Sequence, residues 1–210
     1  MIAKQLNEKG ILAKILEKAI EILLKKECKK IGKVEIDIIA GSIQIIKGII
    51  KKISIQAEDI NYKDLLLDKV KLEAKDVEII FKISNKELKL KNDLIIKFKI
   101  SLSENSIKTI LFSNSWGWIG NMISKEMLNQ DSLCDIKIKS DELFIKGIND
   151  KKQIFEVEKF ELKNDKGKIY LVSNSTDKFI EIPIEDKVCI KDVNISNNLI
   201  NITAKSSVSF

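Results

Sequence analysis

The sequence contains no histidine and no arginine, and it has a single proline. Without histidine, the chain lacks the commonest general base and the commonest zinc ligand, and it can form no Ser-His or Cys-His catalytic arrangement. Phosphate-binding glycine motifs are absent as well. Glu35 and Asp37 share one face of an expected strand, where a solvated polar face explains them better than a cation site. We therefore expect a protein that is not an enzyme and that uses no cofactor and no metal.

Cysteine is also scarce. Cys28, Cys134 and Cys189 are odd in number and widely separated, which predicts free thiols and no disulfide framework. No two of them have the spacing of a metal-binding pair.

The formal net charge is +6, and all 37 basic residues are lysine. A positive charge alone would suggest nucleic acid or an anionic membrane. Proteins that read nucleic acids usually use arginine for bidentate contacts, and here lysine and glutamate are interspersed along the chain. The sequence therefore predicts no nucleic-acid partner.

Long hydrophobic runs are missing. No stretch is long enough to span a bilayer, and the N-terminus lacks the uninterrupted apolar run of a secretory signal. We expect a cytoplasmic protein, with peripheral association to a membrane as the open question.

What the sequence does have is a long alternation of apolar residues with lysine or glutamate, for example over 70–75 and 135–139. This period of two is typical of strands in an antiparallel sheet with one buried face. The ranges expected as strands are 33–39, 42–47, 50–58, 66–74, 76–83, 87–91, 93–102, 133–139, 142–147, 153–162, 167–174, 179–184, 187–195 and 199–209. Asn164 to Gly167 predicts a hairpin turn, and Pro183 predicts an edge or terminal position in its strand.

Three helices are expected among these strands. Residues 11–27 form a strongly amphipathic pattern whose apolar arc covers about half the circumference, wider than the ~100° of an ordinary surface helix. In mid-chain, Ser103 is a candidate N-cap for a short helix that runs to 111 or 112, and a second helix is expected over 116–128. No linker divides the chain, so residues 1–210 are interpreted as one α+β domain.

Three segments carry a resemblance to a known family. Gly41 to Ile49 leads into Ile53-Ser54-Ile55-Gln56-Ala57 and then Leu65 to Leu72; Ser101 to Ile107 forms a mid-chain helix start; and the chain ends in hairpins from Ile182 to Val208. This pattern resembles the LmeA-like phospholipid-binding family, bacterial proteins once catalogued as a domain of unknown function. The resemblance implies a long, curved antiparallel sheet wrapped around the N-terminal helix, with a mid-chain helical pair, similar to tubular lipid-binding folds. It also implies binding of a glycerophospholipid, without catalytic residues.

A lipid would need a dry groove for its acyl chains. We expect this groove between the sheet and the helices. The predicted lining residues are Leu12, Leu16, Ile20, Leu23, Phe98, Ile100, Ile110, Leu111, Trp116, Trp118, Ile119 and Met122. Trp116 and Trp118 are expected at the mouth, where an amphipathic ring suits a membrane interface, with ordinary core packing as the alternative.

The predicted function is thus non-enzymatic binding of a phospholipid or similar lipid at a membrane surface, with transfer and sensing as open variants. The alternative is a protein-interaction module that uses an exposed strand edge or an apolar face. A continuous tunnel through the interior would favour lipid, whereas a packed core with a flat apolar patch on the exterior would favour a protein partner.

Overall fold

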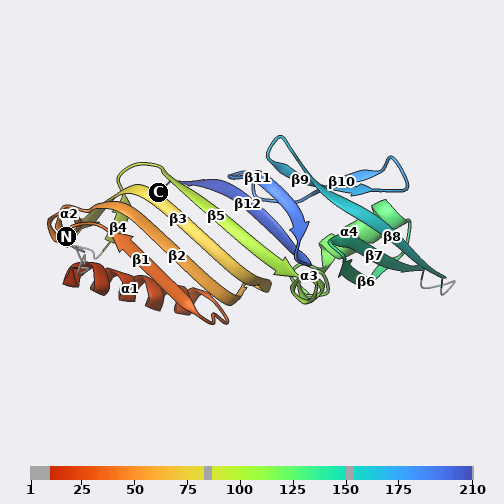
Figure 1. Cartoon of the computed structure of the whole chain (residues 1–210), viewed down its shortest axis with the longest axis horizontal. Coiled ribbons are helices and arrows are strands. Elements are labelled where there is room, and N and C mark those ends of the chain that lie inside the picture. Colours follow the sequence, from red (N-terminus) through yellow and green to blue (C-terminus); the bar gives the residue numbers. More distant parts are fainter. Residues whose placement is uncertain (1–9, 83–86, 150–153, 210) are drawn as a thin grey trace, which may run out of the picture.

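The computed structural model describes residues 10–82, 87–149 and 154–209, which form helices and antiparallel strands (Figure 1). The helices are α1 (Ile11–Glu27), α2 (Ser42–Ile46), α3 (Glu104–Leu111) and α4 (Gly117–Leu128). The strands are β1 (Val34–Ile39), β2 (Ile49–Tyr62), β3 (Leu65–Lys82), β4 (Glu87–Leu90), β5 (Leu94–Ser103), β6 (Ser132–Lys139), β7 (Glu142–Asn149), β8 (Ile154–Asp165), β9 (Lys168–Ser173), β10 (Phe179–Ile182), β11 (Val188–Ser196) and β12 (Leu199–Val208). The α+β class and the antiparallel pairing predicted from the sequence are confirmed.

The strands form two sheets, so the expectation of a single long sheet is wrong. The large sheet has the order β1-β2-β3-β5-β12-β11, with β4 paired to β3, and the small sheet has the order β10-β9-β8-β7-β6. The physical reason is that α3 and α4 interrupt the chain after β5, and the next five strands pair among themselves. The chain then returns, and β12 pairs with β5 from Leu199 opposite Ser103 to Val208 opposite Leu94.

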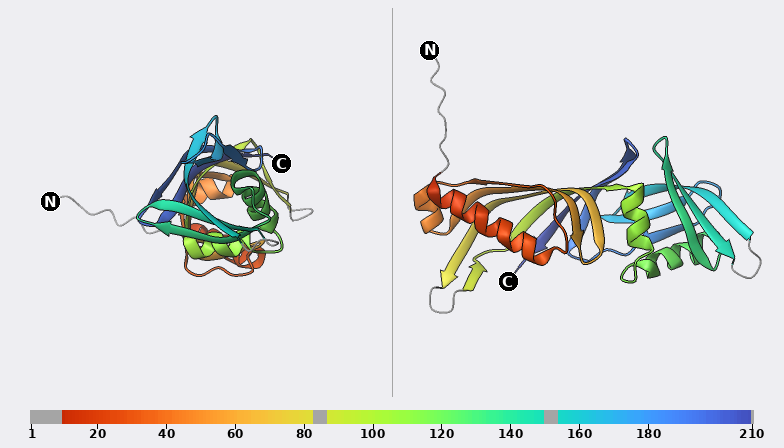
Figure 2. Two further views of the ribbon diagram at one scale, coloured as in Figure 1. Left: turned by 90° about the vertical axis from the view of Figure 1, so that its right-hand side faces the viewer. Right: turned by 90° about the horizontal axis from the view of Figure 1, so that it is seen from below.

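The two sheets meet where β11 passes the β8–β9 turn. The Ile190 N–H donates to the Gly167 carbonyl at 2.8 Å, and the Asn164 side-chain amide donates to the Lys191 carbonyl at 3.1 Å. The molecule is elongated, with α1 along the large sheet at one end and the small sheet with α4 at the other (Figures 1 and 2). Helix α3 lies at the junction, in contact with β3, β5 and β6.

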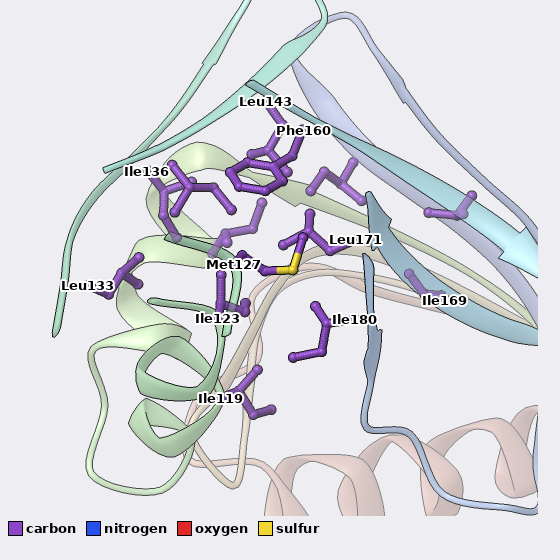
Figure 3. Packing of buried hydrophobic residues seen from close by; sticks show 14 of the residues in the cluster. Ile119, Ile123, Met127, Leu133, Ile136, Leu143, Phe160, Ile169, Leu171 and Ile180 are labelled. Atoms are coloured by element: carbon purple, nitrogen blue, oxygen red, sulfur yellow. The ribbon is translucent and has the colours of Figure 1, made fainter. Parts of the chain in front are cut away.

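The buried apolar side chains form two separate clusters. The N-terminal cluster, under α1, consists of Ala13, Ile38, Ile50, Ala74 and Val77, with Leu16 and Ile20 packed against it. The central cluster lies between the small sheet, α3, α4 and the returning strands β11 and β12 (Figure 3). Each sheet therefore buries one face, as the alternating pattern predicted.

Two predicted strands are corrected. Residues 42–47 contain the short helix α2, because the Gln44 side chain accepts a hydrogen bond from the Gly41 N–H at 2.9 Å and closes the first turn. The ranges predicted as two strands, 66–74 and 76–83, form one strand, β3, as far as Lys82, and position 83 lies outside the described residues. Asp76 adopts a left-handed conformation (φ 52°) without breaking the pairing, since Lys75 still lies opposite Lys52 and Val77 opposite Ile50.

Other predictions are confirmed. Helix α1 spans Ile11–Glu27, and Ser103 caps α3 by accepting a hydrogen bond from the Ser106 N–H at 3.3 Å. Lys166 and Gly167, both with positive φ, form the hairpin turn between β8 and β9. Pro183 directly follows β10, an edge strand of the small sheet. Among the residues that the structure describes, no helix is long and apolar enough to cross a bilayer.

Candidate functional site

A cavity of about 470 Å³ lies between the two sheets and the mid-chain helices. Strands of both sheets, α3, α4 and the segment before β11 all contribute to its wall. The lining residues are Leu65, Leu67, Phe98, Ile100, Leu102, Ile107, Ile110, Leu111, Trp116, Ile119, Ile123, Ile136, Leu143, Ile145, Leu162, Ile169, Leu171, Ile182, Pro183, Ile184, Glu185, Val188, Ile190, Val193, Ile200 and Ile202. Within the described part of the chain, Glu185 is the one charged residue in this wall.

The alternating pattern of the strands builds the wall on the side of the large sheet. Phe98, Ile100 and Leu102 lie on one face of β5, because successive side chains of a strand point to opposite faces. Pairing with β12 places Ile202 opposite Ile100 and Ile200 opposite Leu102. The two strands thus present a continuous apolar surface to the cavity.

Helix α3 closes the cavity where the two sheets meet, and polar contacts hold its N-terminus and its middle in place. Asp68 of β3 accepts hydrogen bonds from the Ser103 N–H at 2.6 Å and from the Ser103 hydroxyl at 3.0 Å. One turn on, Lys108 forms ion pairs of 2.8 Å with Glu104 and with Asp135 of β6. These contacts turn the apolar side of α3, with Ile107 and Ile110, toward the cavity.

The Lys108 group also perturbs its partners electrostatically. The Lys108 ammonium, and then the Ile138 N–H that donates at 2.9 Å, lower the pKa of Glu104. The same ammonium lowers the pKa of Asp135, and the two carboxylates raise the pKa of Lys108. The group is therefore fully ionised at neutral pH and links α3 to the small sheet.

Trp116, at the start of α4, forms another part of the wall. Its indole Nε1 donates to the Lys63 carbonyl at 3.0 Å, and its backbone N–H donates to the Ser113 hydroxyl at 3.1 Å. The neighbouring Ser115 hydroxyl donates to Asp64 at 2.7 Å. The β2–β3 turn thereby fixes the position of the tryptophan ring.

The end of β10 and the segment that follows it bring Ile182, Pro183, Ile184 and Glu185 to the cavity. A turn hydrogen bond of 2.9 Å from the Val188 N–H to the Glu185 carbonyl shapes the segment. Glu185 is exposed, so its charge lies at the solvent side of the wall.

Half of the predicted site residues line the cavity. These are Phe98, Ile100, Ile110, Leu111, Trp116 and Ile119. Met122 packs against the central cluster without lining the cavity, and the side chain of Trp118 is 51% exposed. Trp116 lines the cavity and Trp118 does not, because residues two apart on a helix point in directions about 200° apart.

The prediction that α1 lines the same groove is wrong. Leu16 and Ile20 pack against the N-terminal cluster, Leu12 is half-buried, and Leu23 is 60% exposed. The structure thus places Leu12, Leu16, Ile20 and Leu23 outside the cavity wall. Helix α1 contacts β1 and α2, whereas the cavity is built from strands further along the chain.

Sequence reasoning missed the contribution of the small sheet and of β11. The buried face of the small sheet carries Leu143, Ile145, Ile169 and Leu171. Figure 3 shows Leu143 and Leu171 in the same cluster as Ile119 and Ile123 of α4. Their alternation marked them as buried, but no signal in the sequence distinguished a cavity wall from a packed core.

The described residues hold no group of three or more cysteine, aspartate or glutamate side chains arranged to bind a metal ion. Glu35 forms an ion pair of 2.6 Å with Lys33, which lowers the pKa of the carboxyl. All three cysteines are free, as predicted. The apolar wall of the cavity is suited to holding an apolar ligand.

Comparison with known proteins adds no relative. The chain matches no family model, no curated protein and no solved structure.

Proposed function

We propose that this protein binds a phospholipid or a similar lipid, without catalysing a reaction, by taking its acyl chains into the apolar cavity at a membrane surface. The observation that carries the proposal is a cavity of about 470 Å³ whose wall, in the described residues, contains no charged side chain except Glu185. Ligand cavities in proteins typically measure about 300–1,000 Å³. The volume and the apolar wall both suit one or two hydrocarbon chains.

The driving force is the transfer of methylene groups from water. Each buried methylene contributes about 0.8 kcal/mol, so ten of them contribute about 8 kcal/mol before the cost of ordering the ligand. The wall offers almost no polar partner to water, and apolar cavities favour apolar occupants over water molecules. The headgroup remains outside the cavity, on the solvent side where Glu185 is exposed.

The family assignment belongs to this proposal. The segments from Gly41 to Leu72 and from Ser101 to Ile107 resemble the LmeA-like phospholipid-binding family, whose fold is an elongated sheet wrapped around a long helix. Support comes from the packing of Ala13, Leu16 and Ile20 of α1 against the large sheet, and from the helical pair at the junction of the sheets. We infer a single tubular lipid-binding domain that acts at the periphery of a membrane.

A protein-interaction module is the alternative. A fully packed core would favour it, and the apolar cavity, which is open to solvent on one side, favours lipid instead. Exposed apolar side chains do occur, for example on α1 and α2, but they lie outside the cavity wall.

The first test is native mass spectrometry of protein purified without detergent, followed by lipid analysis of any bound mass. We expect an added mass that matches a phospholipid, near one per chain. A clean mass of the chain alone would contradict the proposal.

A matched pair of variants ties the bound mass to the cavity. Ile202→Trp fills the cavity from β12, whereas Thr203→Trp places the same ring on the opposite face of the same strand. We expect Ile202→Trp to lose the lipid and Thr203→Trp to retain it, with circular dichroism confirming that both variants fold. Equal lipid retention by both variants would show that the lipid does not occupy this cavity.

A further inference from the structure

Helix α1 has a second apolar side, which faces away from the sheet. Ile11, Ile15, Ile22 and Leu23 are between 58% and 76% exposed. At 100° per residue, positions 11, 15, 22 and 23 fall within one third of the helix circumference. The side that faces the sheet is a different one, with Ala13 buried and Leu16 and Ile20 packed on the N-terminal cluster. The apolar arc of α1 is therefore wide because one part of it packs against the sheet and another part is exposed.

The neighbouring helix α2 also exposes apolar side chains. Ile43 and Ile46 are 70% and 76% exposed, and their spacing of three puts them on one side of this short helix. The two helices adjoin, since a methyl group on Gly10 would come within 2.7 Å of the Ser42 hydroxyl. Figures 1 and 2 show α1 and α2 together at one end of the molecule. We call Ile11, Ile15, Ile22, Leu23, Ile43 and Ile46 the end patch.

The charges that border the end patch are mostly positive. Lys14, Lys26 and Lys47 are exposed and have no acidic partner in the described part of the chain. Around the helix, Lys14 lies just beyond Ile11, and Lys26 lies within the stripe.

Two of the three acidic residues of α1, Glu17 and Glu21, are engaged by other groups. Glu17 accepts a hydrogen bond of 3.0 Å from the Ile38 N–H and so points toward β1. Glu21 is held by Lys18 at 2.9 Å and Lys25 at 2.6 Å, which lowers the pKa of its carboxyl to about 2. Its charge is therefore matched locally.

We propose that the end patch docks this protein on an anionic phospholipid bilayer. A helix with an apolar stripe bordered by lysines lies in the plane of a membrane interface, where the apolar side chains enter the acyl boundary and the lysines meet lipid phosphates. A second copy of this chain would bring the same lysines together across the contact, in a protein of net charge +6. Charge complementarity thus favours a membrane over self-association. The inference rests on the membrane part of the proposed function and names the surface that docks. It does not depend on the cavity, because the end patch shares no residue with the cavity wall.

Co-sedimentation with vesicles tests the docking. Wild-type protein should bind vesicles of phosphatidylcholine with phosphatidylglycerol, bind vesicles of phosphatidylcholine alone less, and lose binding as salt is added. Ile15→Gln with Ile22→Gln should weaken binding more than about tenfold, because two isoleucine side chains no longer enter the apolar layer. Lys14→Gln with Lys26→Gln should remove the preference for phosphatidylglycerol.

The matched control is Val157→Gln with Phe179→Gln, since these side chains are 60% and 66% exposed on the small sheet. This variant should bind vesicles like the wild type. Equal loss in both apolar variants, or no vesicle binding by the wild type, would overturn the proposal. A dimer dispersed by Ile15→Gln with Ile22→Gln would also overturn it, because the patch would then serve self-association.

The lipid content of the same variants separates this proposal from the cavity. Ile15→Gln with Ile22→Gln should retain co-purified lipid, whereas Ile202→Trp should lose that lipid and still bind vesicles. Loss of both properties in both variants would contradict the independence of the two surfaces.

Discussion

The indole of Trp116 donates a 3.0 Å hydrogen bond to the carbonyl of Lys63, which lies 53 positions earlier in the sequence. This bond ties the start of α4 to the β2–β3 turn, while the ring of Trp116 forms part of the cavity wall. Trp118, two positions on, points elsewhere and is half exposed. The two tryptophans of the chain therefore report on different environments.

This difference predicts a selective fluorescence response. In Trp118→Phe, Trp116 is the only tryptophan, and phospholipid with brominated acyl chains should quench it strongly, because bromine quenches indole at close contact. In Trp116→Phe, the remaining Trp118 should be quenched much less by the same lipid in detergent-free, vesicle-free solution. Equal quenching of the two variants would show that the acyl chains do not occupy the cavity beside Trp116.

Gly120 predicts a second measurable effect, on stability. A methyl group at this position would come within 2.9 Å of the Leu111 carbonyl and 3.0 Å of a Leu133 methyl, whereas one on Gly117 would be 3.5 Å from the Leu111 carbonyl. Gly120→Ala should therefore lower the free energy of unfolding by about 1–3 kcal/mol through overpacking. Gly117→Ala is the matched control, and it should be neutral or stabilising by up to about 1 kcal/mol, because alanine is the better helix former.

Urea unfolding measures both variants. Gly120→Ala should also reduce lipid binding, because Leu111 lines the cavity and has to move. Equal unfolding midpoints for the two variants would mean that α3 and α4 can separate without cost.

The sequence predicted those elements whose local pattern is unambiguous. The period of α1, the Ser103 cap and the Asn164 to Gly167 turn each depend on residues within a few positions, and the structure confirms all three. At 42–47 the same reasoning was wrong. The apolar pattern there is compatible with either a strand or a helix, and the hydrogen bond from the Gly41 N–H to the Gln44 side chain favours the helix.

The site was harder to predict, because periodicity identifies an apolar face but not its neighbour. Phe98 and Ile100 were assigned to the groove from their shared face on β5, and the structure places both in the cavity wall. Leu16 and Ile20 were assigned to the same groove from an equally clear face, and they pack at the other end of the molecule. Whether facing side chains touch or leave a cavity depends on the separation of the two sheets, which no local pattern encodes.

The last prediction concerns Lys108, which joins α3 to β6 through Glu104 and Asp135 at 2.8 Å each. Lys108→Met should lower the melting temperature at neutral pH by about 2–4 °C, the shift expected for about 1 kcal/mol lost from partly exposed ion pairs in a chain of this size. Lys99→Met is the control, since Lys99 is exposed on β5 and has no acidic partner in the described residues, and its melting temperature should not change.

The effect should depend on pH with a definite sign. The pKa values of Glu104 and Asp135 are lowered in the folded state from ordinary values of 4.5 and 3.8, so folding favours the ionised carboxylates. This stabilisation is present above pH 4.5 and is lost as the pH falls through the lowered folded values. The pKa of Lys108 is raised from its ordinary value of 10.5, so its stabilising contribution is fully present below pH 10.5 and is lost only as the pH rises through the raised value. Thermal unfolding of wild type and Lys108→Met from pH 7 to pH 2 should therefore show a difference that is constant above about pH 5 and shrinks in acid. A difference that persists unchanged at pH 2 would mean that the lysine acts through the packing of its methylene stem and not through its charge.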